Sequence, residues 1–301
     1  MNGLGSEKHR SGSSAVSYTP AQAALVALMF LGWQLVLGFA LGSLLLRLSA
    51  EPGSARTALL GNPLLSLIGI NLLAFVLTLL GEHFLKRWRW RDLGGWTFRP
   101  GLLGPLLLLL VAEKILSSEL DNLLRAVRPM PPALGHYLGS LQAPGRTGLA
   151  AVALMLVAGL TEEVIFRGLL LGGLRRVRGA RVALLVSAGL FALIHLNPWQ
   201  FAHAFALGLI LGWTFLRTRS LLLCIVLHGA SNGLNLLTRQ LPWAIRGFNA
   251  PHPPAAVWFQ PWWFDLAGLA AVALAVALFH RLTAPAARAR LADQTPGDAG
   301  N

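Results

Sequence analysis

The segment 147-TGLAAVALMLVAGLTEEVIFRGLL-170 decides the fold of this chain. Residues 147–160 carry no charge, and then two adjacent glutamates and an arginine, Glu162, Glu163 and Arg167, stand in an otherwise apolar run. A bilayer-spanning helix needs about 20 mostly apolar residues. An ionisable side chain at the bilayer centre costs about 2.5–3.5 kcal/mol on insertion scales, and such residues usually have a function. The segment therefore predicts a transmembrane helix that carries part of a functional site.

The whole chain has the composition of an integral membrane protein. Of its 301 residues, 55% are hydrophobic and only 12% are charged, whereas a soluble domain carries about 25% charged residues. The mean hydropathy is +0.60. The net charge is +13, but a nucleic-acid-binding surface would need a folded polar domain, so we expect no nucleic-acid partner. The single cysteine, Cys224, excludes an intramolecular disulfide framework.

The apolar runs predict an all-α bundle of about eight transmembrane helices. The turn at Asn197-Pro198-Trp199 divides a long run without Asp, Glu, Lys or Arg into two spans. The eight predicted spans are 22–46, 58–81, 101–118, 147–174, 181–196, 199–216, 220–237 and 262–282. The chain would then consist of a disordered cytoplasmic N-terminus (1–20), a transmembrane domain (21–283) and a disordered cytoplasmic tail (284–301).

Lysine and arginine residues are distributed unequally between the two sides of these spans. Sixteen of the 25 fall on the side of the two termini, eight fall on the opposite side, and Arg167 lies within a span. Cytoplasmic loops carry the excess of Lys and Arg, so both termini are predicted to be cytoplasmic. High use of Ala, Leu, Arg and Gly is typical of a GC-rich bacterium, which predicts the bacterial inner membrane.

His195, which ends the segment 191-FALIH-195, is predicted to lie at the same depth as Glu162. The spans that carry them form a predicted hairpin with its turn near Arg178. At a rise of about 1.5 Å per residue, both side chains lie about 25 Å along their helices from this turn. The hairpin therefore brings a carboxylate and an imidazole together inside the membrane.

The segment 228-HGASN-232 adds His228 and Asn232, which are spaced i,i+4 and therefore share one helix face. They lie roughly 14 Å and 20 Å into their span, close enough to face the same cavity as Glu162. Buried polar pairs that only hold helices together are the alternative interpretation. His203 stands at a similar depth, and helix packing or an interfacial position is the simpler interpretation of it.

These residue types suit the hydrolysis of a peptide bond without a covalent nucleophile. A carboxylate with an imidazole can hold a water and act as general base, and an imidazole with a carboxamide can donate hydrogen bonds to a developing oxyanion. Glu162, His195 and His228 could instead bind Zn²⁺ with one open position, and the spacing does not decide between the two. The motifs HExxH and GxSxG, which mark other hydrolases, are absent from the chain.

The segments 162-EEVIFR-167, 191-FALIH-195 and 228-HGASN-232 match, in order, the patterns EExxxR, FxxxH and HxxxN. The chain thereby resembles the CPBP family of intramembrane proteases, which includes the type II CAAX prenyl endopeptidases and bacterial relatives once labelled abortive-infection proteins. The stretch 205-FALGLILGWTFLRTRSLLLCIVLHGASN-232 is also similar to that family. The protease core covers about 147–240, and the first three spans carry no matching motif.

The resemblance implies a CAAX-type endopeptidase with its active site inside the membrane. Glu162 would be the general base that polarises water together with His195, and His228 and Asn232 would form the oxyanion hole. The resemblance implies no firm cofactor, although a divalent metal such as zinc stays an alternative. The expected substrate is a membrane protein or a lipid-anchored peptide in the bilayer.

The resemblance gives Glu163 and Arg167 a supporting role, in which they orient the other site residues. Two other kinds of protein could use the same buried polar cluster. A proton-coupled transporter would use it as a relay, but it predicts paired broken helices and an internal repeat, neither of which is visible. A non-catalytic immunity or assembly factor would keep the motif for folding alone.

Overall fold

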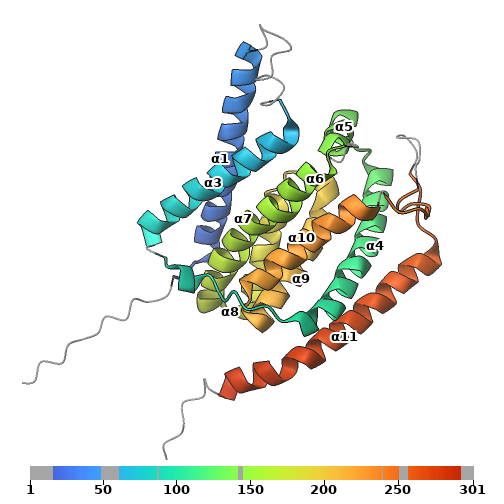
Figure 1. Cartoon of the computed structure of the whole chain (residues 1–301). Coiled ribbons are helices and arrows are strands. Elements are labelled where there is room, and N and C mark those ends of the chain that lie inside the picture. Colours follow the sequence, from blue (N-terminus) through green and yellow to red (C-terminus); the bar gives the residue numbers. More distant parts are fainter. Residues whose placement is uncertain are drawn as a thin grey trace, which may run out of the picture.

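The computed structural model describes residues 16–48, 61–86, 88–141, 145–238, 240–250 and 257–292 (Figure 1). Every regular element in these ranges is a helix, which confirms the predicted all-α class. The long α-helices are α1 (Pro20–Leu48), α3 (Pro63–Lys86), α4 (Leu103–Val127), α8 (Gly172–Leu193), α9 (Pro198–Thr218), α10 (Leu221–Thr238) and α11 (Trp262–Ala292). The shorter elements are η1 (Trp90–Asp92), η2 (Pro100–Leu102), α5 (Pro132–Leu141), α6 (Thr147–Ala150), η3 (Ala151–Ala158), α7 (Gly159–Glu163) and η4 (Val164–Leu171).

Seven helical stretches in the described ranges are long and apolar enough to cross a membrane. The longest, Thr147–Leu193, has 47 residues and turns back on itself at Gly179, where φ is 76° and ψ is 172°. Glycine adopts this positive φ at little cost. Ser187 Oγ donates a hydrogen bond to the Phe166 carbonyl at 3.0 Å across the turn. The predicted spans 147–174 and 181–196 are therefore two arms of one hairpin, and the bundle has about eight spans.

The third span is longer than predicted, because α4 continues from 118 to Val127. Its second half is amphipathic, and its polar side chains make contacts inside the protein. Asn122 Nδ2, for example, donates to the Gly247 carbonyl at 2.7 Å. The helix α5 was not predicted. Residues 1–15, 58–60 and 293–301, on which parts of the predicted N-terminus, second span and tail fall, lie outside the described residues.

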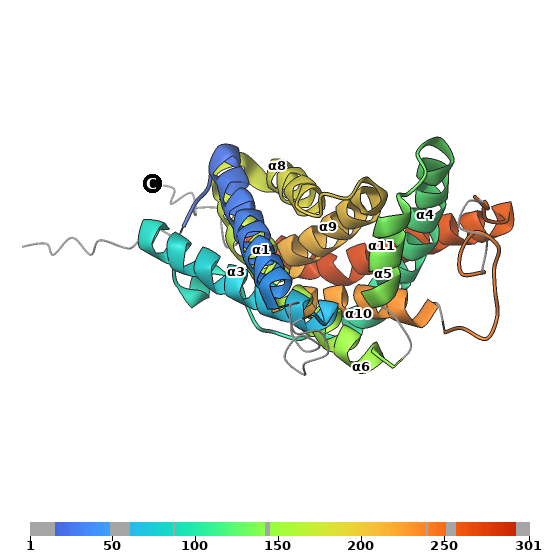
Figure 2. The ribbon, with the colours of Figure 1, turned by 90° about the horizontal axis from the view of Figure 1, so that it is seen from above.

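The helices form three groups side by side, as Figures 1 and 2 show from two directions. The helices α1 and α3 lie on one side, α4 and α11 lie on the other, and the segment from α6 to α10 lies between them. One buried apolar cluster joins α1 and α3 to η4 and α8. A second joins α4 and α11 to α9 and α10. The central group, which carries all three sequence motifs, is therefore covered on both sides.

The arginine-rich connections gather at one end of the bundle. The Gly95 amide donates to the Arg219 carbonyl at 2.7 Å, which ties the α3–α4 connection to the α9–α10 turn. Arg217 Nε donates to Thr283 Oγ1 at 2.9 Å near the end of the described part of α11, and Arg176 reaches the segment before α1. Segments that the sequence places on one side of the membrane thus lie together in space.

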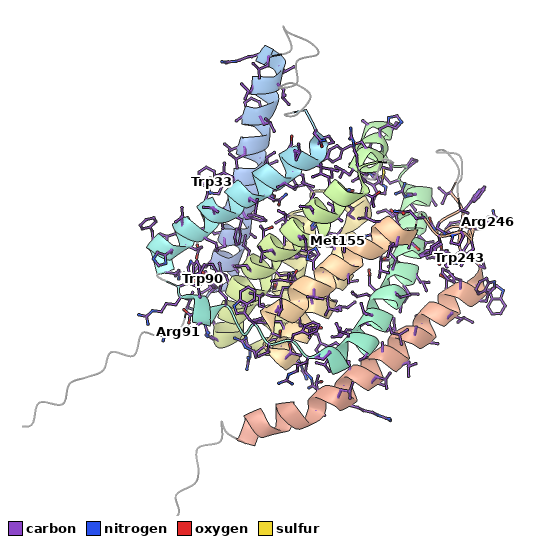
Figure 3. The ribbon with its side chains drawn as sticks, viewed as in Figure 1. Trp33, Trp90, Arg91, Met155, Trp243 and Arg246 are labelled. Atoms are coloured by element: carbon purple, nitrogen blue, oxygen red, sulfur yellow. The ribbon has the colours of Figure 1, made fainter. Side chains whose placement is uncertain are left out.

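Tryptophans mark both ends of the bundle. In Figure 3, Trp90 lies with Arg91 at the arginine-rich end, and Trp243 lies beyond the end of α10 at the opposite end. Both residues are more than half exposed. Amphipathic tryptophan rings prefer the boundary between lipid and water. Their positions are consistent with a bundle that crosses the bilayer along its long helices.

The segment before α1 is anchored by a buried tyrosine. Tyr18 Oη donates to Glu82 Oε2 of α3 at 2.6 Å, and its ring packs directly against Gly173 of α8. Burial, and next the hydrogen bond to Glu82, raise the pKa of the Tyr18 phenol well above its ordinary value of 10.0. This contact fixes α1 and α3 against the central helices.

Candidate active site

Glu162 and Glu163 lie in a short α-helical stretch between two π-helical segments, η3 and η4. In a π-helix the backbone hydrogen bonds join residues i and i+5. Such segments are rare in proteins, and those that occur are often found at functional sites. The helix α10 packs closely here because Gly229 has no side chain. A Cβ atom at Gly229 would lie 2.9 Å from the Met155 carbonyl oxygen. This close approach brings His228 to the two glutamates.

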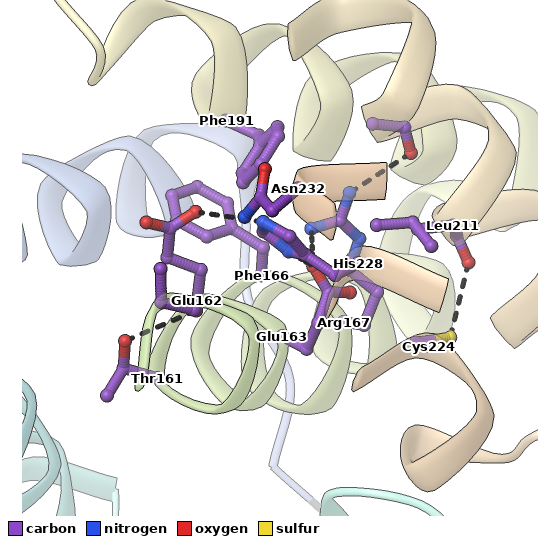
Figure 4. A network of polar contacts seen from close by, with 12 residues as sticks. Thr161, Glu162, Glu163, Phe166, Arg167, Phe191, Leu211, Cys224, His228 and Asn232 are labelled. Carbon is purple, nitrogen blue, oxygen red and sulfur yellow. Dashed lines mark hydrogen bonds and ion pairs between the residues drawn. The ribbon is translucent and has the colours of Figure 1, made fainter. Parts of the chain in front are cut away.

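Glu163 is the centre of a fully buried polar network, shown in Figure 4. Its Oε1 accepts from Arg167 Nη1 at 2.7 Å and from His228 Nδ1 at 2.8 Å. The side chains of Glu163 and Arg167 are both 0% exposed, so the i,i+4 pair predicted from the sequence is buried. Arg167 Nη2 also donates to the Gly208 carbonyl at 3.3 Å. Glu163 and Arg167 thus fix the orientation of His228.

Glu162 faces the other nitrogen of the same histidine. The distance from Glu162 Oε2 to His228 Nε2 is 3.9 Å, and the Glu162 side chain is 12% exposed, unlike that of Glu163. This distance exceeds that of a direct hydrogen bond, and polar groups so separated are commonly bridged by water. The two adjacent carboxylates therefore differ: Glu163 is fully buried in an ion pair, and Glu162 is partly exposed.

His195 lies two residues beyond the end of α8 and is held by the backbone of that helix. Its Nδ1 lies 2.8 Å from the Phe191 carbonyl oxygen. Since a carbonyl can only accept, Nδ1 carries the hydrogen, and Nε2 of the neutral ring is left as an acceptor. The Phe191 ring lies edge-on to both histidines, with centroids 5.1 Å from His195 and 5.8 Å from His228. Among the described residues, no hydrogen bond or ion pair joins His195 directly to Glu162.

Asn232 lies one helical turn beyond His228 on α10. Its Nδ2 donates to the Leu154 carbonyl of η3 at 2.7 Å, which leaves its second amide hydrogen for another partner. The structure therefore joins Glu162, Glu163, Arg167 and His228 by direct contacts. It links His195 to them through Phe191, and it places Asn232 beside them with its side chain tied to η3.

The part of the chain that carries this site is also the part that matches a known protein family. Residues 144–234 match the family model of the type II CAAX prenyl endopeptidase, Rce1-like. These residues, the Rce1-like domain of the chain, are therefore similar to CAAX-type proteases. The matched residues include all three motifs, which confirms the resemblance found in the sequence. No curated protein and no solved structure matches the chain.

A cavity of about 710 Å³ borders the Rce1-like domain at Asn232. Its walls come from α4, α5, α9, α10 and the segment 247–250. His203 also lines it and, through Nδ1, bonds the buried carboxylate of Glu113 on α4 at 2.9 Å. The cavity thus connects a residue of the third motif with a second histidine–carboxylate pair from outside the motifs.

Three contributors to this site were not identified from the sequence. Phe191 was noted only as a letter of its motif, although its ring contacts both histidines and lies 4.5 Å from the Arg167 guanidinium carbon. The Gly208 carbonyl is a backbone group, so no residue type in the sequence indicates its role. Glu113 lies within the predicted third span, and a carboxylate inside an apolar run was itself the signal.

The proposed zinc ligands Glu162, His195 and His228 can be tested against the geometry. In the described part of the chain, no three His, Cys, Asp or Glu side chains are grouped closely enough to hold one metal ion. The Nδ1 bonds of His228 to Glu163 and of His195 to the Phe191 carbonyl leave Nε2 of each ring as the nitrogen that could bind a metal. Because the three side chains are not grouped closely enough, zinc coordination by them would require a rearrangement.

Proposed function

We propose that the Rce1-like domain hydrolyses a peptide bond inside the membrane with a water molecule held by Glu162. The observation that carries the proposal is the pair of adjacent glutamates with different surroundings. Glu163 is sealed with Arg167, whereas Glu162 is partly open and faces His228 Nε2 at 3.9 Å. A general base must be reachable by its water, and only Glu162 of the two meets this condition.

In this mechanism Glu162 and His195 hold the attacking water between them. His195 supports this role because its Nδ1 is occupied by a backbone carbonyl and its Nε2 is an acceptor. The water oxygen attacks the carbonyl carbon, and its proton passes to Glu162. When the C–N bond breaks, that proton passes to the leaving amine, so the products are a carboxylate end and an amino end. No other reactant than water is consumed.

His228 and Asn232 would stabilise the oxyanion that forms during the attack. His228 Nε2 can donate when the ring carries its second proton, and Glu163 holds the ring from behind through Nδ1. Asn232 keeps one amide hydrogen after its bond to Leu154. Removal of one such donor typically costs about 10²–10³ in rate. Glu163 and Arg167 act here as positioning residues.

The substrate that suits this site is a membrane protein or a lipid-anchored peptide. The bilayer surrounds the bundle, so a substrate anchored in the same membrane meets the site by lateral diffusion. The proposed location is the bacterial inner membrane with both termini in the cytoplasm. The proposed chemistry uses no metal ion. The alternative is a mechanism with a zinc ion, for which the ligand side chains would have to rearrange.

The test is the cleavage of a quenched fluorogenic CAAX-type peptide by the detergent-purified protein. Glu162→Gln is expected to lower the rate by about 10²–10⁴, the usual contribution of a general base. Glu82→Gln is the matched control, because Glu82 is also buried but bonds Tyr18 away from the site. The Glu82→Gln variant should keep nearly full activity when the purified protein elutes as a single peak.

The metal content of the same samples distinguishes the metal-free mechanism from the zinc mechanism. Cleavage without stoichiometric metal and without an effect of chelators supports the glutamate-bound water. One zinc per chain, with activity lost on chelation and restored by zinc, would refute it. Full activity of the folded Glu162→Gln variant would refute the role of Glu162. A pH-gradient-driven flux in liposomes without any cleavage would instead favour a transporter.

A further inference from the structure

The arginine-rich end of the bundle carries far more basic than acidic side chains. In the segments that meet there, 82–102, 172–182, 216–222 and 279–284, the acidic side chains are those of Glu82 and Asp92. Glu82 bonds the buried Tyr18, and Asp92 accepts from the Arg89 backbone amide at 2.9 Å. The described lysine and arginine residues of the same segments are Lys86, Arg89, Arg91, Arg99, Arg175, Arg176, Arg178, Arg181, Arg217, Arg219 and Arg281. The positive charge at this end therefore exceeds the negative charge several-fold.

At the opposite end of the bundle, acidic and basic side chains are mixed, and the arginines have partners inside the protein. Arg125 pairs with Asp121 at 2.6 Å. The guanidinium groups of Arg128 and Arg246 each lie over a tryptophan ring, at 5.7 Å and 5.4 Å from the ring centroids. The excess of unpaired charge is therefore a property of one end and not of the whole chain.

The basic segments pack against one another and so form one surface. A Cβ atom at Gly172, at the start of α8, would lie 3.9 Å from the Asp92 carbonyl oxygen of η1. The Gly95 amide joins the same connection to the α9–α10 turn through the Arg219 carbonyl at 2.7 Å. Four exposed arginines of these segments form no ion pair within the described chain, and we call them the basic surface: Arg89, Arg91, Arg178 and Arg181.

Exposed apolar side chains lie directly beside the basic surface. Phe84 and Leu85, at the end of α3, are 80% and 72% exposed, and two arginines of the surface follow them in the chain. Val182 of α8 is exposed next to the other two. In Figure 3, the exposed Trp90 lies with Arg91 at this edge of the bundle. The edge therefore offers charge to a headgroup and apolar contact to the chains attached to it.

We propose that the basic surface binds anionic phospholipids, with their phosphate groups on its arginines and their acyl chains along the apolar side chains of α3 and α8. Arginine presents a planar fork of donors that pairs with two phosphate oxygens at once. A basic residue beside the membrane strengthens the binding of anionic lipid about fivefold. A free phosphate ion or a soluble acidic polymer would use only the charges, whereas a phospholipid uses the charges and their apolar neighbours together.

Retention of lipid by the full chain tests the proposal without depending on peptide cleavage. The protein is purified in an uncharged detergent, mixed with equal amounts of phosphatidylglycerol and phosphatidylcholine, and passed through a gel-filtration column. Mass spectrometry then quantifies the lipids that stay with the protein. We expect the wild-type chain to retain phosphatidylglycerol over phosphatidylcholine by about fivefold or more at low salt. The preference should weaken at high salt, because the Debye length falls to about 3 Å at 1 M.

Two double variants locate the lipid on the surface. Arg89→Gln with Arg91→Gln, and Arg178→Gln with Arg181→Gln, should each remove most of the preference for phosphatidylglycerol. The same pairs replaced by lysine should keep most of it, because the charge is retained. All four side chains are exposed, so the variants should fold like the wild-type chain. The apparent Tm, measured with a thiol-reactive dye on the buried Cys224, checks this.

Arg128→Gln with Arg246→Gln is the matched control, because it removes two exposed charges at the opposite end of the bundle. It should keep the wild-type preference, and an equal loss in this control would overturn a localised site. Equal retention of the two lipids by the wild-type chain would overturn the proposal outright. Displacement of phosphatidylglycerol by an equal concentration of inorganic phosphate, or of soluble polyglutamate, would overturn the assignment of the surface to a lipid.

Discussion

Replacement of Arg167 by methionine should be among the most destabilising changes in this protein. The variant leaves the Glu163 carboxylate, which is 0% exposed, with His228 as its sole remaining side-chain partner among the described residues. Breaking a buried ion pair by removing one member costs about 3–5 kcal/mol, because the other charge stays uncompensated. At about 2–4 °C per kcal/mol, the apparent Tm should fall by roughly 6–20 °C. Since membrane proteins often unfold irreversibly, the values must be compared at one scan rate.

The chain provides both the probe and the control for this measurement. Cys224 is fully buried, so a dye that fluoresces on reaction with a thiol reports unfolding. Arg125 forms a second i,i+4 ion pair with Asp121, but their side chains are 34% and 26% exposed. Arg125→Met should therefore lower the free energy of unfolding by no more than about 1 kcal/mol.

A double variant identifies the cause of the Arg167 effect. Glu163→Gln combined with Arg167→Met leaves no unpaired charge, so it should recover a large part of the stability lost in Arg167→Met alone. The reasoning is refuted if Arg167→Met shifts the apparent Tm no more than Arg125→Met does. It is also refuted if the double variant is less stable than Arg167→Met, because the penalty would then not come from an uncompensated carboxylate.

Three further changes test other contacts. Gly229→Ala adds a Cβ 2.9 Å from a backbone carbonyl oxygen and should cost about 1–3 kcal/mol, whereas Gly189→Ala, with no atom within 4 Å, should be neutral or slightly stabilising in the same thermal assay. Glu113→Ala removes the partner of His203 and should cost about 1.5–3 kcal/mol, and an unchanged apparent Tm would refute a native Glu113–His203 bond. The raised pKa of buried Tyr18 means that its contribution to stability is complete below pH 10.0 and is lost as pH rises through the folded pKa. Tyr18→Phe should therefore reduce the loss of stability above pH 10, as measured by tryptophan fluorescence; an equal loss in both proteins would contradict this.

The sequence predicted the bundle well where apolar runs end at charged turns. The hairpin around Gly179 was found because four arginines surround it, and the structure has its turn there. The second half of α4 was not predicted, because a high number of polar residues is also typical of a loop. They are in fact bonded inside the protein, as Asn122 is to Gly247. The π-helical segments depend on backbone bonding, which residue periodicity does not encode.

The sequence predicted how deep in the membrane the site residues lie, but not how each helix is rotated about its axis. Counting residues from the turns placed Glu162, His228 and His195 at similar depths, and the i,i+4 rule predicted the pair of Glu163 with Arg167. Which histidine stands next to Glu162 depends on the rotation of each helix and on side-chain rotamers. The structure gives His228 this position, whereas His195 Nδ1 bonds the Phe191 carbonyl of α8.

The adjacent glutamates show why this rotation matters for function. Successive residues of a helix differ by about 100° in direction, so Glu162 and Glu163 can approach the same imidazole from two sides. Glu163 bonds Nδ1 in a buried network with Arg167, and the partly exposed Glu162 faces Nε2 at 3.9 Å. Two groups of identical chemistry thereby gain different surroundings, and different surroundings are what separate the roles of paired carboxylates in hydrolases. In the proposed mechanism the doubled glutamate is therefore needed as a pair: Glu163 fixes the histidine, and Glu162 acts on the water.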